Sequence, residues 1–168
     1  MIQIRKGVFE TNSSSTHSIT FSGKELEQNK MAVDYDGYIH ATFGEFGWEV
    51  ESYYDQATKL SYLLTMAMHL NDFYVWCCRS TEDAERKIEE FMQTEDFKRI
   101  SDAVGEYTHC NGIIVDYGEG YIDHQSREYG CLDEFLYDCG VDIINFVFGD
   151  VVVHTDNDNR YIDDDEWN

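Results

Sequence analysis

Apolar and polar residues alternate along five stretches of the chain, a pattern typical of β-strands with one buried face. The stretches are residues 2–9, 18–23, 31–43, 111–126 and 151–159. Asp36-Gly37 interrupts the third stretch, and Glu119-Gly120 interrupts the fourth. Such pairs favour a two-residue hairpin turn, because glycine adopts positive φ without strain. We therefore expect two hairpins and three further strands.

Apolar residues recur at three- and four-residue spacing in four other segments, which predicts amphipathic helices. The segments are residues 55–70, 80–93, 96–104 and 131–140. Asp55 and Ser80 open the first two and are suitable N-caps, whereas Gly105 and Gly140 are expected to end the other two. This order of elements predicts an α+β fold, with a mainly antiparallel sheet and three to four helices packed on one face.

The length of the chain, 168 residues, fits one domain over residues 1–168 with an acidic tail from about residue 156. A chain of this length buries roughly 70% of its unfolded surface. No stretch reaches the ~20 apolar residues of a membrane span, and the first residues lack the apolar segment of a signal peptide. We therefore expect a cytoplasmic protein that does not bind membranes.

The five cysteines are expected to be reduced, because their number is odd and no export signal is visible. Cys77 and Cys78 are adjacent, so they do not form the CxxC pair of redox or zinc sites. The other three cysteines and His109 could together bind zinc, although their spacing matches no standard zinc knuckle. We expect the cysteines to act as small, buried apolar residues.

The charge of the chain is strongly negative, with 34 acidic residues against 12 Lys and Arg and a formal net charge of −22. The excess is greatest in residues 101–168, which contain Arg127 and Arg160 as their only Lys or Arg residues. A field of this sign repels nucleic acid and anionic membranes and attracts basic surfaces. Either the charge serves solubility, or the C-terminal part presents carboxylates to a partner that normally grips phosphates.

The second of these interpretations places the partner-binding site on acidic residues near the C-terminus. The candidate contacts are Asp133, Glu134, Asp138, Asp142, Asp163, Asp164, Asp165 and Glu166. Their carboxylates would take the place of phosphates, and Tyr and Phe side chains between them would supply apolar contacts. The expected partner is a basic, nucleic-acid-binding host protein, and direct binding to nucleic acid is not expected.

A polar segment, residues 11–18, connects two of the predicted strands. Its hydroxyl and amide side chains can stabilise a turn by bonding to nearby backbone amides. They could also form a catalytic loop, in which His17 would act as a base for Ser13 or Ser14. The length of the segment favours a site, because a hairpin needs only two to five residues, but no third catalytic residue follows from the spacing.

Histidines stand beside carboxylates in two places, and together these residues could bind a divalent metal ion. The candidate ligands are Asp123, His124, His154, Asp156 and Asp158. Such a metal would activate water for hydrolysis of a phosphoester or a similar bond. The spacing matches no established metal motif, and such pairs also occur in capped turns.

The opening of the chain, "IRKGVFETNSSSTHSI", resembles a group of uncharacterised small proteins from Gram-positive bacteria and their phages. These proteins begin with Arg-(Lys/Arg)-Gly-x-Phe-Glu-Thr-Asn-Ser-Ser-Ser-Thr-His-Ser, and "GEFGW" and "YIDHQS" look like further shared segments. The specific similarity covers about thirty of the 168 residues. It implies a phage or mobile-element setting and no particular reaction.

Two hypotheses follow from specific features of the sequence, and a virion or assembly component is also compatible with its size. The leading one is an acidic, phage-type accessory protein without a cofactor that inhibits a host nucleic-acid-handling or defence factor, in the manner of an anti-CRISPR or anti-restriction protein. The alternative is a small metal-dependent hydrolase or transferase that acts on a nucleotide. Its site would join the loop from Ser13 to His17 with Asp123, His124 and Asp156.

Overall fold

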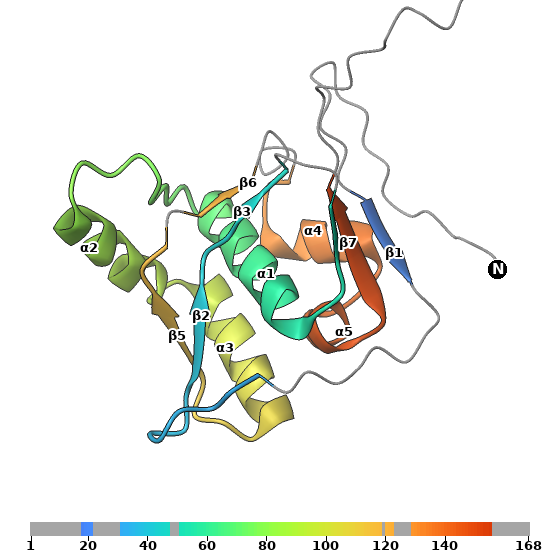
Figure 1. The fold of residues 1–168 in the computed structure, drawn as a ribbon. Helices are drawn as coiled ribbons and strands as arrows, with labels where there is room; N and C mark the ends of the chain where they lie inside the picture. Colours follow the sequence, from blue (N-terminus) through green and yellow to red (C-terminus); the bar gives the residue numbers. More distant parts are fainter. Residues whose placement is uncertain (1–17, 22–30, 48–50, 119, 123–128, 156–168) are drawn as a thin grey trace, which may run out of the picture.

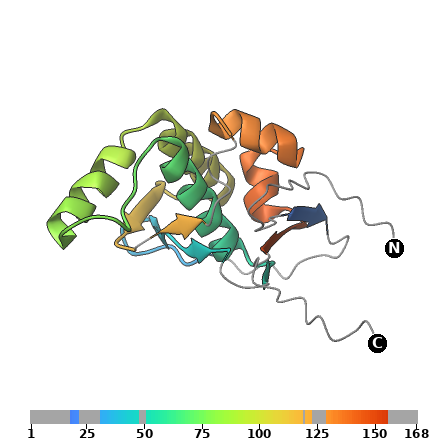
Figure 2. The same cartoon turned by 90° about the horizontal axis from the view of Figure 1, so that it is seen from above.

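The structure is a computed structural model that describes residues 18–21, 31–47, 51–118, 120–122 and 129–155. It confirms the predicted α+β class, with helices and short strands mixed along the chain (Figure 1). The helices lie mostly on one side of the strands (Figure 2). None of the helices in the described residues is both long and apolar enough to cross a membrane.

The described strands form three small sheets instead of one mainly antiparallel sheet. The first sheet has the order β1-β7-β4 and is antiparallel, whereas β2 pairs with β5, and β3 with β6, in parallel. The strands are β1 (Ser18–Phe21), β2 (Ile39–Thr42), β3 (Glu45–Phe46), β4 (Glu51–Tyr53), β5 (Ile113–Asp116), β6 (Tyr121–Ile122) and β7 (Val151–Thr155).

The second predicted hairpin is wrong, because β5 and β6 pair with β2 and β3 and not with each other. The cause is the crossover between β2 and β5, which contains three helices and carries the chain back to the end of the sheet where β2 began. A crossover of this kind leads to a parallel neighbour. The pairing buries Ile39 on β2 and Ile113 on β5.

The first predicted turn, around Asp36-Gly37, is confirmed. Gly37 has a φ of +86°, and its N–H donates to the carbonyl oxygen of Asp34 at 3.2 Å. The Asp34 carboxylate also accepts from the N–H of Tyr38 at 2.8 Å. A single bridge, between Val33 and Ile39, joins the two arms. The turn therefore forms at the predicted place, but it is not the predicted two-residue turn: the N–H of Asp34 donates to the carbonyl oxygen of Tyr38 at 2.8 Å, so residues 35–37 lie between the paired positions. The second arm pairs mainly with β5.

Local sequence sets the ends of most helices. Asp55 accepts from the N–H of Thr58 at 2.8 Å, and Ser80 accepts from that of Asp83 at 3.2 Å, as their N-cap positions predict. Gly140, with a φ of +70°, ends the fourth helix. The helices are α1 (Gln56–Leu70), α2 (Thr81–Phe91), α3 (Glu95–Thr108), α4 (Leu132–Cys139) and α5 (Ile143–Phe148).

Two features of the helices differ from the prediction. Helix α3 continues past Gly105 to Thr108. Gly105 is buried, and a Cβ at this position would approach the carbonyl oxygen of Cys110 at 3.2 Å. Gly105 therefore allows a close contact and does not end the helix. The helix ends at His109, where φ is +60°. Helix α5 is not predicted, because five of its six residues are apolar and leave no amphipathic period to detect.

Helix α1 forms the centre of the hydrophobic core. Leu63, Leu64 and Ala67 are completely buried, so this helix packs on several sides. Lys59 is also completely buried. Its Nζ donates to the carbonyl oxygens of Gly149 at 2.8 Å and Val151 at 3.1 Å, and it thereby ties α1 to the connection between α5 and β7.

The cysteines only partly follow the prediction that they are buried. Cys139 on α4 is buried, whereas Cys77 and Cys131 are exposed. The prediction is wrong for these two because they lie before helices and not on their apolar faces. Cys77 belongs to the loop between α1 and α2, and Cys131 is the N-cap residue of α4.

Candidate functional site

Four of the acidic residues predicted to bind a partner lie in the described part of the chain, on α4 and just after it. Asp133 and Glu134 are exposed, Asp138 is half-buried and Asp142 is exposed at the start of α5. Tyr137 lies one helical turn after Asp133, and 84% of its surface is exposed. The outer face of α4 therefore combines carboxylates with a large aromatic ring.

A groove of about 370 Å³ lies between α3, α4 and the start of α5. Two predicted contacts, Asp133 and Asp142, are among the residues that form it. The lining residues are Arg99, Ala103, Asp133, Leu136, Tyr137, Val141, Asp142, Ile143 and Ile144. The groove therefore has an apolar floor, with charged side chains and a tyrosine around it.

The carboxylates around the groove have defined positions. Asp133 pairs with Arg99 at 2.6 Å, and this hydrogen bond raises the pKa of the Arg99 guanidinium. Asp142 accepts from the backbone N–H of Asn145 at 2.7 Å and caps α5. Glu134 accepts from the N–H of Gly130 at 2.7 Å. These bonds fix the orientation of the three carboxylates.

The other residues predicted for the acidic surface and the polar loop lie outside the described residues. These are Asp163, Asp164, Asp165 and Glu166 for the surface, and Ser13, Ser14 and His17 for the loop. The same is true of four candidate metal ligands, Asp123, His124, Asp156 and Asp158. Those assignments stay predictions.

His154 is the one candidate metal ligand that the structure describes. It lies on β7 opposite Ser52 of β4, and its Nδ1 is 2.6 Å from the Ser52 hydroxyl. Within the described part of the chain, no three His, Cys, Asp or Glu side chains are arranged to hold a metal ion. His154 therefore contributes to a cross-strand hydrogen bond between two strands of the antiparallel sheet.

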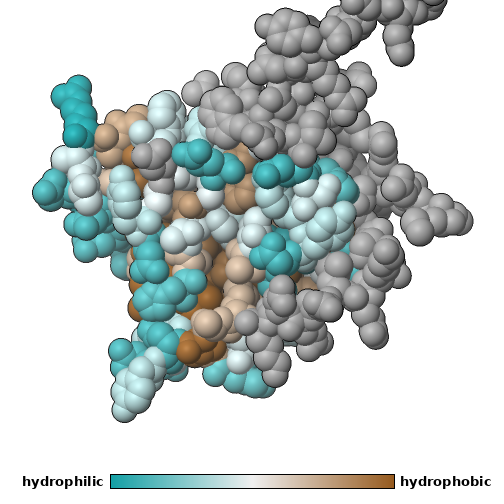
Figure 3. Space-filling model, viewed as in Figure 1, coloured by the Kyte–Doolittle hydropathy of each residue, from teal (hydrophilic) through white to brown (hydrophobic). Residues whose placement is uncertain are grey.

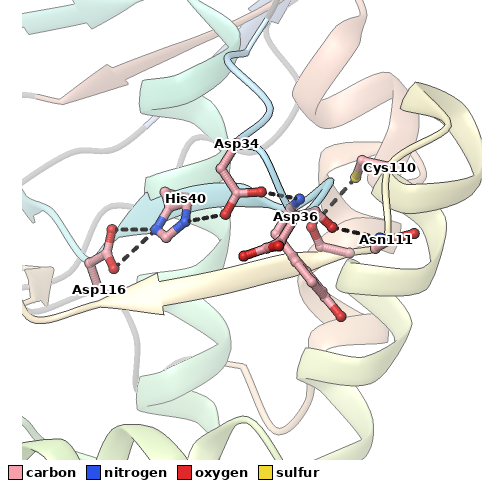
Figure 4. A network of polar contacts seen from close by, with 8 residues as sticks. Asp34, Asp36, His40, Cys110, Asn111 and Asp116 are labelled. Atoms are coloured by element: carbon pink, nitrogen blue, oxygen red, sulfur yellow. Dashed lines mark hydrogen bonds and ion pairs between the residues drawn. The ribbon is translucent and has the colours of Figure 1, made fainter.

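A cluster of polar side chains that the sequence did not indicate lies on the face of β2 and β5 (Figure 4). His40 Nε2 is 2.8 Å from Asp34 Oδ2, and His40 Nδ1 is 3.0 Å from Asp116 Oδ2. Asp34, followed by Asp116, raises the pKa of His40. The N–H of Tyr38, followed by His40, lowers the pKa of Asp34. The imidazole ring thus joins the Asp34–Gly37 turn to β5.

His40 also lies at the edge of a groove of about 430 Å³ between β2, β3, β4 and the beginning of α1. Glu45 and Glu51 line it, and the hydroxyl of Tyr53 donates to Glu51. Because both ring nitrogens of His40 face carboxylates, its imidazole is not oriented as a general base toward this groove. On the face that carries β2 and β5, hydrophilic side chains surround smaller apolar areas (Figure 3).

Comparison with known protein families, with curated proteins and with solved structures finds no match for this chain. The features of the described residues that bear on function are therefore the two grooves and the charge around them. The groove beside α4 is the one that brings sequence-predicted residues together, because Asp133 and Asp142 lie on it.

Proposed function

We propose that this protein acts by binding a basic, nucleic-acid-binding partner and thereby blocks that partner's access to nucleic acid. The observation that carries the proposal is the groove beside α4, where Asp133, Asp142 and the exposed ring of Tyr137 surround an apolar floor. Carboxylates can satisfy Lys and Arg side chains that otherwise bind phosphates, and the apolar floor supplies the desolvated contact that holds an anchor residue.

The balance of charge around the groove supports a basic partner. Arg99 is the one Lys or Arg among the groove's lining residues, and Asp133 already pairs with it. The described residues from 101 to 155 contain no Lys or Arg at all. A positively charged surface is therefore attracted toward this side of the molecule over a distance of about 8 Å at physiological salt.

The resemblance of the chain's opening to small proteins of Gram-positive bacteria and their phages supports a role inside a host cell. A phage-type protein of this charge would protect the phage by binding to the nucleic-acid site of a defence nuclease or of another host factor. The proposed site of action is the host cytoplasm, and the interaction needs no cofactor.

A photo-crosslinking amino acid at position 137 tests the proposal in host cells. We expect the crosslinker to capture a basic, nucleic-acid-binding protein, and a crosslinker at Tyr35, which is exposed in the Asp36-Gly37 turn, not to capture it. Capture should weaken as salt rises from about 0.05 to 0.2 M in lysate, because screening shortens the range of charge attraction.

A pair of charge variants separates this site from the effect of total charge. Glu134→Gln with Asp138→Lys changes the charge of α4 and keeps an acceptor for the Gly130 N–H, whereas Glu85→Gln with Glu89→Lys makes the same change on α2. We expect the α4 pair to slow association with the captured protein at least tenfold and the α2 pair to have a much smaller effect. Equal effects of both pairs, or an affinity that does not depend on salt, would contradict the proposal.

A further inference from the structure

Two thiols converge in the loop between α1 and α2. The Sγ of Cys77 is 3.3 Å from the carbonyl oxygen of Tyr74, and the Sγ of Cys78 is 3.6 Å from the same oxygen. Neighbouring residues in an extended chain point to opposite sides. Here a turn, closed by the N–H of Cys78 bonding to the carbonyl oxygen of Val75 at 3.0 Å, brings both thiols to the same oxygen.

A third donor reaches this oxygen, so neither thiol is firmly held. The Nζ of Lys87 on α2 lies 3.0 Å from the carbonyl oxygen of Tyr74. A carbonyl oxygen has two lone pairs and an S–H group is a weak donor. Three donors therefore share two positions, and Lys87 can satisfy the oxygen when the thiols react elsewhere.

The thiol pair is accessible from outside. Cys77 is exposed and Cys78 is partly exposed. The preceding residue, Trp76, is also 50% exposed and contacts the ring of Tyr121 edge to face at a centroid distance of 5.5 Å. A small reagent can approach the pair without opening the core.

We propose that Cys77 and Cys78 form a dithiol site that captures trivalent arsenic in monosubstituted arsenicals. In the reaction, the arsenic centre R–As(OH)₂ exchanges its two hydroxyl groups for the two sulfur atoms. Two As–O and two S–H bonds break, two As–S and two new O–H bonds form, and the two hydroxyl groups leave as two water molecules. No electron is transferred, so neither an oxidant nor a reductant is needed.

The surroundings favour this chemistry over binding of a divalent metal ion or exchange with a disulfide. Burial raises the pKa of the Cys78 thiol, and Lys87 offsets only part of this effect. Metal binding and disulfide exchange need the thiolate, and a dication would also lie close to the Lys87 ammonium. Condensation with arsenic consumes two thiols overall, releases no proton and gives a neutral product.

Intact-protein mass spectrometry with phenylarsine oxide tests the site on the full chain. We expect one adduct per chain that survives an excess of a monothiol and is removed by a dithiol such as 2,3-dimercaptopropanol. Cys77→Ser and Cys78→Ser should each weaken retention of the adduct at least about 100-fold, because the second bond is then no longer intramolecular. Cys131→Ser, which removes another exposed thiol, should retain the adduct.

Two further measurements support or overturn the assignment independently of these variants. After treatment of the wild-type protein, alkylation and peptide mapping should find Cys77 and Cys78 protected. The adduct should also change the tryptophan fluorescence, and Trp76→Phe should remove most of that change. Protection of other cysteines in place of this pair, or an equally stable adduct on a Cys77→Ser/Cys78→Ser double variant, would overturn the proposal.

Discussion

Replacing the buried lysine of α1 by methionine should change the way stability depends on pH. Lys59 is completely buried, and its Nζ has two backbone carbonyl acceptors, on Gly149 and Val151. Burial lowers the pKa of Lys59 from 10.5 to about 8, although Asp150 and Asp55 act in the opposite direction. Methionine keeps the unbranched apolar stem and removes the charge.

The expected effect follows from proton linkage. Between about pH 8 and pH 10.5 the folded protein releases the proton of Lys59 while the unfolded chain still binds it, so the free energy of unfolding rises with pH in this window. A pKa difference of this size amounts to roughly 2.5 kcal/mol between about pH 7 and about pH 10. Lys59→Met lacks this contribution, so the stability of the wild type relative to the variant should increase by that amount.

Urea denaturation at a series of pH values measures the difference directly. The raised pKa values of the Cys139 thiol and the Tyr62 hydroxyl, both caused first by burial, destabilise both proteins alike at high pH and cancel in the comparison. Lys98→Met, at an exposed lysine of α3, reports the general effect of losing one positive charge. A wild-type minus Lys59→Met difference that stays constant to within about 0.5 kcal/mol would refute the reasoning.

Four other outcomes can be checked. Asp116→Asn should lower the pKa of His40 in an NMR titration, because Asp116 helps to raise it. The stability that protonated His40 contributes is full below about pH 6.5 and declines as the pH rises through its raised pKa, so in the variant this decline should begin at a lower pH. Asp142→Ala should reduce the free energy of unfolding by about 1 kcal/mol through loss of the α5 cap. If the protein is instead a metal-dependent enzyme, Mn²⁺ or Mg²⁺ at a hundred times its dissociation constant should raise the free energy of unfolding, measured by denaturation, by about 2.7 kcal/mol. Absence of any such increase would count against the enzyme hypothesis. If residues 11–18 form a site, Ser14→Ala and His17→Ala should abolish function and leave the melting temperature nearly unchanged, whereas parallel losses would indicate a structural loop.

The parts of the fold that could be predicted are those that neighbouring residues determine. Asp55, Ser80 and Gly140 mark helix ends through their own backbone bonds and dihedral angles, and the Asp36-Gly37 turn closes within four residues. A sequence pattern contains this information directly. Gly105 shows the limit of such a pattern, because a glycine can mark a helix end or a close contact, and here a Cβ would lie 3.2 Å from the carbonyl oxygen of Cys110.

The parallel strand pairs and the His40 cluster could not be predicted, because they depend on residues far apart in the sequence. His40 and Asp116 are 76 positions apart, and the path of three helices between them decides that their strands meet. Asp34 is only six positions from His40, so the sequence alone could suggest this pair. It could not show that Asp116 completes the cluster from the other side of the ring. The groove beside α4 was partly predictable, since Asp133 and Asp142 are close in sequence, whereas Arg99 joins them from α3.

The order of strands in the antiparallel sheet has a consequence for the synthesis of the chain. Its central strand, β7, is the last of the three to be made, and the described pairings of β1 and β4 within this sheet are both with β7. About 100 residues separate β4 from β7, so at a translation rate of 5 to 20 residues per second β4 waits roughly 5 to 20 seconds for its partner. During that time β1 and β4 expose unsatisfied backbone groups in the crowded cell. A ribosome stalled before residue 151 would therefore hold a chain whose helices can form while this sheet cannot.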